Sequence, residues 1–187
     1  MITRTLLLFL GLTLFAHNAN AQQRDHLTPQ EVDLVKEAQV LDKRIDVFIK
    51  AADRRILVLN GGAVAAAPAK TKQAKKEAEL WGELPTGSRA ELVSDIARIL
   101  DEAITNIDDV SARDERNPLI AKSLRRLAQA TNTIIEQLKP LRVQAKSDAE
   151  IASFETLNED AQSILEAANK LPPEVEKSDK KGKTKNN

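Results

Sequence analysis

Apolar residues recur at steps of three and four along separate stretches of the chain, which is the spacing of a helix that buries one face. The most regular repeats run from Leu92 to Val110 and from Ile120 to Ala145. Ser88, followed three residues later by Glu91, is a capping box and predicts where the first of these helices begins. The Asn117-Pro118 pair supplies an N-cap and a first-turn proline, so we expect a tight turn there and an antiparallel helical hairpin.

Two more helices are predicted on either side of this hairpin. Thr28-Pro29-Gln30-Glu31 combines an N-cap, a proline at the first helical position and a capping-box glutamate, and Asn60-Gly61-Gly62 ends the repeat that follows. Ser147 with Glu150 opens the last helix. Pro140 lies inside the preceding repeat, so we expect a kink there or an early end near Leu138.

The pattern therefore predicts an all-α fold, an up-down bundle of four long amphipathic helices at residues 29–59, 88–116, 118–145 and 148–171. A long connection joins the first two helices and short connections join the rest. The alternative is a three-helix, spectrin-like bundle of residues 88–171, with the first helix attached loosely or exchanged with a partner molecule. The spacing of apolar residues does not separate these two arrangements.

The remaining stretches have little regular apolar spacing. Residues 22–28 are polar and are expected to be flexible. Residues 63–79 are rich in Ala, Lys, Gln and Glu, and we interpret them as a mobile linker with partial helix after Ala69. Residues 80–87 concentrate two leucines, the tryptophan and a proline, which favours an ordered loop. Residues 172–187 are charged and poor in apolar side chains, so they are expected to be disordered.

Residues 1–21 have the features of a secretory signal peptide. Arg4 precedes an apolar run from Leu6 to Ala16, and the small residues Ala19-Asn20-Ala21 suit cleavage after Ala21. The run is about half the length of a membrane span, so a stable membrane anchor is not expected. We predict an exported protein, periplasmic or extracellular.

Composition limits the chemistry of the exported chain. The full sequence has 28 basic and 28 acidic side chains, and removing residues 1–21 takes away Arg4 and no acid. The chain has no cysteine, and after removal of residues 1–21 it retains His26 as its one histidine and no methionine. Haem ligation and di-iron sites of helical bundles need more such ligands, so we expect no cofactor and no metal. His26 is interpreted as a solvated side chain.

Charged side chains are interpreted as solvated surface. Acids along residues 91–115 alternate with Arg98, Arg113 and Arg116, which favours ion-paired helix faces over a calcium site. The near-neutral total charge and the scarcity of aromatic side chains argue against nucleic-acid binding. No nucleophile with a neighbouring base is evident, so the sequence does not predict an enzyme.

Three polar residues occupy positions where the repeats should be apolar. They are Arg55, Asn106 and Thr131. Asn106 and Thr131 lie at similar distances from the predicted turn at residue 117, so they are expected within about one turn of each other along the hairpin. A polar seam residue commonly sets helix register, and the alternative is that the three line a small ligand pocket.

Trp81 and Leu84 are the candidate partner contacts. Trp81 has two interpretations: an anchor that holds the 80–87 segment onto the bundle, or a contact for a partner, because tryptophan is favoured at binding hot spots.

Leu27-Thr28-Pro29-Gln30-Glu31 resembles the Leu-Thr-x-x-Gln signature of small periplasmic helical stress chaperones, with Glu31 in place of the glutamine. The span from Trp81 to Leu171 is similar to exported bacterial helical-bundle proteins of unassigned function. The sequence favours a non-catalytic exported interaction or structural protein. The alternative is a periplasmic chaperone-like binder of unfolded clients. The expected partner is a protein, and self-association is compatible with this expectation.

Overall fold

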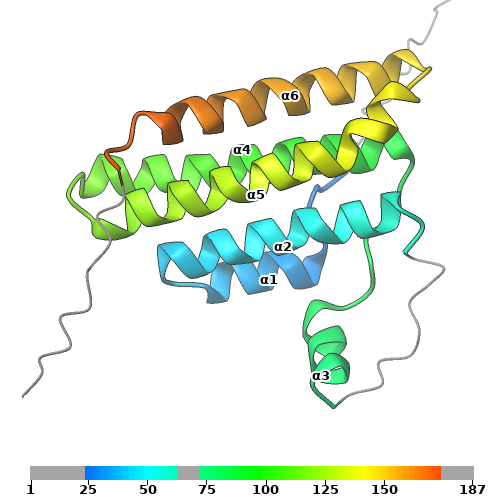
Figure 1. Ribbon diagram of the computed structural model, residues 1–187. Coiled ribbons are helices and arrows are strands. Elements are labelled where there is room, and N and C mark those ends of the chain that lie inside the picture. Colours follow the sequence, from blue (N-terminus) through cyan, green and yellow to red (C-terminus); the bar gives the residue numbers. More distant parts are fainter. Residues whose placement is uncertain (1–23, 63–71, 174–187) are drawn as a thin grey trace, which may run out of the picture.

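The computed structural model describes residues 24–62 and 72–173, which contain helices and no strand, so the all-α prediction is confirmed (Figure 1). The helices are α1 (Pro29–Glu37), α2 (Leu41–Leu59), α3 (Lys72–Trp81), α4 (Arg89–Arg113), α5 (Pro118–Val143) and α6 (Asp148–Asn169). The predicted signal peptide, residues 63–71 of the predicted linker and residues 174–187 of the predicted tail lie outside the described residues.

The four long helices α2, α4, α5 and α6 lie side by side with alternating directions (Figure 1). Both α2 and α6 pack against α4 and α5, and α4 also contacts α5. Ile45 and Phe48 of α2 are fully buried in the same core as Ile96 and Ile99 of α4. Helix α2 is therefore an integral part of the core within this chain, unlike the loosely attached first helix of the three-helix alternative.

The helix starts follow from local hydrogen bonds that the sequence predicts. Both capping boxes are present, with the Thr28 hydroxyl accepting from the Glu31 amide and the Ser88 hydroxyl from the Glu91 amide, each over 3.3 Å. Asn117 Oδ1 accepts from the amide of Leu119 over 3.0 Å. These side chains satisfy N–H groups that the first turn of a helix leaves without partners.

The predicted first helix, residues 29–59, is wrong as one continuous element. It is divided at residues 38–40, and α1 folds back antiparallel to α2 (Figure 1). Arg44 Nε donates to the carbonyl of Ala38 over 3.0 Å, so a side chain of α2 satisfies the C-cap carbonyl of α1. The hairpin lets α1 cover α2 with partly buried apolar side chains and brings residue 31 beside residues 54 and 55.

The segment between α2 and α4 also differs from its prediction. The partial helix expected after Ala69 is present as α3, which extends beyond the predicted linker and includes Leu80 and Trp81 of the predicted loop. Gly82 adopts φ +64°, a left-handed conformation that suits glycine at the end of a helix. The ordered loop is therefore confined to residues 82–88.

The expected early end of the third predicted helix near Leu138 is wrong, because α5 continues through Pro140 to Val143. A proline removes one intrahelical hydrogen bond. Leu138 is buried and Leu141 packs against the core, so apolar contacts hold the last turn of α5 in place.

Candidate functional site

Glu31 is the centre of a buried ion network. Its side chain is fully buried, and Oε1 lies 3.0 Å from Arg54 Nε and 2.7 Å from Arg55 Nη1. Its other oxygen, Oε2, accepts from the backbone amide of Thr28 over 2.9 Å. One carboxylate therefore caps α1 and also pairs with two arginines of α2, which holds the α1–α2 hairpin closed.

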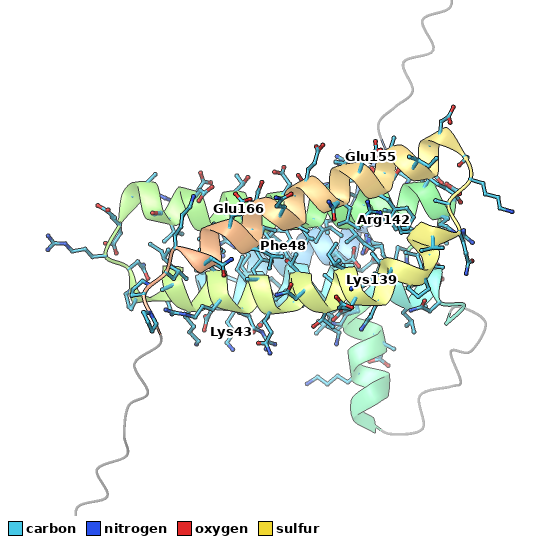
Figure 2. The ribbon with its side chains drawn as sticks, turned by 45° about the horizontal axis from the view of Figure 1, so that its top comes forward. Lys43, Phe48, Lys139, Arg142, Glu155 and Glu166 are labelled. Carbon is cyan, nitrogen blue, oxygen red and sulfur yellow. The ribbon has the colours of Figure 1, made fainter. Side chains whose placement is uncertain are left out.

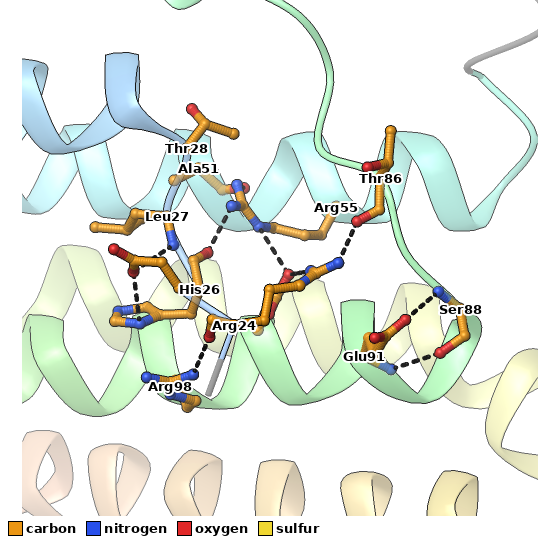
Figure 3. Close-up of polar contacts among 12 residues, drawn as sticks. Arg24, His26, Leu27, Thr28, Ala51, Arg55, Thr86, Ser88, Glu91 and Arg98 are labelled. Carbon is orange, nitrogen blue, oxygen red and sulfur yellow. Dashed lines mark hydrogen bonds and ion pairs between the residues drawn. The ribbon is translucent and has the colours of Figure 1, made fainter. Parts of the chain in front are cut away.

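Arg55 extends this network to α4. Its guanidinium donates to the carbonyls of Ala51, over 2.8 Å, and His26, over 2.6 Å, and its Nε lies 3.8 Å from Asp95 Oδ2 (Figure 3). Arg24 also pairs with Asp95. Burial raises the pKa of Asp95, and the two arginines oppose that rise. Arg55 thus connects the N-terminal segment, α2 and α4.

The segment before α1 is docked against α4, so the expectation of a flexible N-terminus is wrong for residues 24–28. Arg24 donates to the carbonyl of Thr86, and its own carbonyl accepts from Arg98 Nη1 over 2.9 Å (Figure 3). Leu27 is buried in the core. The sequence suggested a solvated segment because its polar residues have no local partners, whereas their partners lie far along the chain.

His26 is also placed differently from its interpretation as a solvated side chain. Its ring is 15 % exposed, and Nε2 lies 2.7 Å from Glu102 Oε2 of α4. This contact adds a second polar link between the N-terminal segment and α4. Glu102 lies at a half-buried position of α4 and 76 residues after His26. The spacing of residues along the chain therefore does not indicate that the two side chains pair.

The centre of the network is closed to solvent. Glu31 and Arg55 are closed off from solvent, and their charges already face opposite charges. An acid or base in catalysis must reach a substrate. Across residues 24–62 and 72–173, no group of three or more His, Cys, Asp or Glu side chains is arranged to hold a metal ion.

Trp81 is buried at the end of α3, between two cations of α2. The Nζ atom of Lys50 lies 5.1 Å from the ring centroid and the guanidinium carbon of Arg54 lies 5.5 Å from it. Burial lowers the pKa of Lys50, and the positive charge of Arg54 acts in the same direction. This geometry matches the anchor interpretation of Trp81, because the ring is enclosed by the protein's own side chains.

Arg54 also holds the loop that follows Trp81. Its Nη2 donates to the carbonyl of Gly82 over 3.4 Å and to that of Glu83. Leu84, the second candidate contact, is half-buried, and Pro85 beside it is buried. The loop is therefore fixed by Arg54 at its start and by Arg24 near its end.

Leu80 is the residue that sequence reasoning missed. Its side chain is 53 % exposed although it adjoins the buried Trp81. Helix α3 packs on α1 and reaches α2 through Trp81, and the rest of it projects away from the bundle (Figure 1). The sequence did not single out Leu80 as a candidate contact, because Trp81 already accounted for the apolar character of that stretch.

The three polar seam residues do not share partners. Arg55 belongs to the ion network, whereas Asn106 is half-buried and accepts from Arg44 Nη1 over 3.0 Å. Thr131 is fully buried, and within the described residues its hydroxyl has no hydrogen-bond partner. The structure thus places each of the three in a different environment.

Comparisons with known proteins add no family to this description. The chain matches no family model, no curated protein and no solved structure. Among the described helices, none is both long enough and apolar enough to cross a membrane.

Proposed function

We propose that this chain is an exported, non-catalytic interaction protein that presents α3 to a partner protein. The observation that carries the proposal is the contrast between neighbouring residues of α3: Trp81 is enclosed by Lys50 and Arg54, while Leu80 is 53 % exposed. The first residue attaches the helix, and the second leaves an apolar side chain open to contact.

The position of α3 supports this role. Helix α3 has ten residues, and its contacts with the other described helices are those with α1 and those of Trp81 with α2. Such a short helix gains little stability from its backbone alone. Its attachment through Trp81 and the arginine-bonded loop keeps Leu80 in a defined place, which lowers the entropy cost of binding.

The role of the ionisable side chains in the network supports a non-catalytic function. Glu31, Asp95 and His26 each face a charged group of another part of the chain, and each contact joins separate elements. The export part of the proposal rests on the sequence of residues 1–21, with its basic residue, apolar run and small residues before the cleavage site.

Site-specific photo-crosslinking in the native cell envelope tests the proposal. A photo-reactive residue at position 80 is compared with one at Val40. Val40 is apolar and 50 % exposed, and it lies at the N-terminal end of α2. We expect a discrete adduct with one envelope protein from position 80 and none from position 40. The same adducts from both positions, or none from either, would refute a contact through α3.

The alternative is a chaperone-like binder of unfolded clients. It is favoured by the exposure of large apolar side chains on several helices, namely Leu57, Leu80, Val143 and Ile151. For this function, position 80 would give a broad ladder of adducts and the mature protein would delay aggregation of an unfolded client. A single adduct without any delay favours the interaction protein.

A further inference from the structure

An apolar groove runs between α5 and α6 near the turn that joins them. Its floor consists of the buried side chains of Leu138, Phe154 and Leu157, and its volume is about 190 Å³. Half-buried Ile135 lines its rim, and Ile151, which is 43 % exposed, lies about one helical turn before Phe154. The groove thus opens an apolar surface on the side of the bundle away from α2.

The two helices that border the groove carry opposite charge. Helix α5 has one acid, Glu136, and five basic residues, namely Lys122, Arg125, Arg126, Lys139 and Arg142. Helix α6 has no basic residue and six acids, namely Asp148, Glu150, Glu155, Glu159, Asp160 and Glu166. Lys122 and Arg126 pair with Asp42 and Asp46 of α2, and Glu150 pairs with Arg89 of α4, so these charges lie away from the groove. Lys139 and Arg142 of α5 line the groove, and Glu155 and Glu159 of α6 are exposed.

The charges beside the groove are not neutralised across it. Lys139 pairs with Glu136 on its own helix, and both side chains are largely exposed. Within the described residues, Arg142 and Glu155 form no ion pair, and both are exposed (Figure 2). Arg142 lines the groove, and Glu155 follows Phe154 of its floor, so the two charges lie at the same end of the α5–α6 face.

We propose that the occupant of this face is a second copy of the chain. A two-fold axis that lies in the interface, parallel to the helices and between α5 and α6, places α5 of each copy over α6 of the other. The basic residues beside the groove of each copy then face acidic residues of the other copy, and the two grooves face each other near the α5–α6 turns. Arg142 of one copy faces Glu155 of the second copy.

The size of the face is sufficient for such a dimer. Helices of 26 and 22 residues are about 39 Å and 33 Å long, and two adjacent helices are about 19 Å wide. Contact along the shorter length would bury about 600 Å² on each copy. The total of about 1,200 Å² is at the lower end of specific protein interfaces, so we expect a dimer that dissociates on dilution.

Charge reversal in the mature chain, residues 22–187, tests the proposal by size-exclusion chromatography with light scattering and by sedimentation equilibrium. Arg142→Glu alone and Glu155→Arg alone each place like charges together twice, so each should weaken dimerisation at least about tenfold. An equimolar mixture of the two variants restores opposite charges at both contacts and should dimerise like the wild type. The variant with both substitutions should also dimerise.

Lys43→Glu on α2 serves as the matched control, because it reverses a charge away from the groove, and it should leave the dimer unchanged. Circular dichroism of every variant checks that the fold is retained. A wild-type chain that stays monomeric at about millimolar concentration, or a mixture that fails to recover the dimer, would overturn the proposal. Either result leaves the crosslinking test of α3 unaffected.

Discussion

The guanidinium of Arg54 lies over the ring of Trp81 and also donates to the carbonyl of Gly82, the residue that follows the ring in the chain. The same guanidinium faces Glu31 on its other side, with Nε 3.0 Å from the carboxylate. Arg54 therefore connects the attachment of α3 to the buried ion network, and the two features are expected to depend on each other.

Replacing Trp81 by alanine should release α3 without unfolding the bundle. Loss of a buried tryptophan costs about 3 kcal/mol, and here the cost falls on an element that has few other contacts. Hydrogen exchange should therefore accelerate for residues 78–88, whereas the amides of α4 and α5 should keep their protection.

Trp81→Phe is the control for this prediction, because a phenyl ring retains an aromatic face between Lys50 and Arg54. It should preserve most of the protection of residues 78–88. Equal loss of protection throughout α4 and α5 in Trp81→Ala would contradict the interpretation of Trp81 as a local anchor.

Thr131→Val should stabilise the protein. The Thr131 hydroxyl is buried and has no hydrogen-bond partner within the described residues, and such a group costs about 1 kcal/mol. Valine keeps the shape and removes the polar atom. The free energy of unfolding, measured in urea, should rise by about that amount.

Thr133→Val is matched to this change, because Thr133 is exposed and its hydroxyl donates to the carbonyl of Gln129 over 3.1 Å. Its effect should stay within about 0.5 kcal/mol. A clear loss of stability in Thr131→Val would show that the hydroxyl has a partner, as the ligand-pocket hypothesis for Arg55, Asn106 and Thr131 requires.

Asp160→Asn should stabilise the protein at neutral pH and not in acid. Burial raises the pKa of Asp160 above its ordinary value of 3.8, and the charges of Asp101 and Glu159 raise it further. The folded state thus binds this proton more tightly than the unfolded state does. The stability of the wild type therefore falls as the pH rises from 3.8 through the raised pKa of the folded state.

Asp160→Asn removes the cost of ionising this carboxyl in the folded state. Because Asp160 is only half-buried, the gain at neutral pH should be about 0.5 kcal/mol or less. It should disappear below pH 3.8, where the wild-type carboxyl is protonated in both states. Thermal melts of both proteins across this pH range measure the difference, and a gain that persists in acid would assign the effect to packing.

Intact-mass analysis of the protein purified from its native cells should give a chain that begins at Gln22, as the proposed export requires. The prediction follows from the small residues before that position and from the docking of Arg24 shortly after it. A mature N-terminus well inside the docked segment, beyond His26, would remove contacts to Asp95 and Glu102 and would be inconsistent with the ion network.

The sequence predicted features that depend on neighbouring residues. Thr28, Ser88 and Asn117 each mark a helix start because the cap and its amide lie within three residues of each other. The end of α2 was predictable for the same reason, since Gly61 takes φ +78° after the C-cap. Apolar spacing likewise identified most of the buried positions of α4 and α5.

Features that depend on distant residues were not predictable. The break at residues 38–40 has no glycine or proline, and the repeat through Leu34 and Leu41 fits one helix as well as two. Docking of the N-terminal segment depends on pairs such as His26 with Glu102, which no spacing rule connects. Glu31 was recognised as a cap, but its second role required knowledge of where Arg54 and Arg55 lie.

The central claim is that buried ionisable side chains of this protein hold helices together, and a double-mutant cycle on Glu31 and Arg55 tests it most directly. Glu31→Gln keeps the cap acceptor and removes the charge, and Arg55→Met keeps an apolar stem. Each should cost about 3 kcal/mol or more in unfolding free energy, with a coupling of at least about 1.5 kcal/mol. The exposed pair Asp33 and Lys36 should couple by less than about 0.5 kcal/mol. A coupling for Glu31 and Arg55 as small as that of the exposed pair would contradict the account.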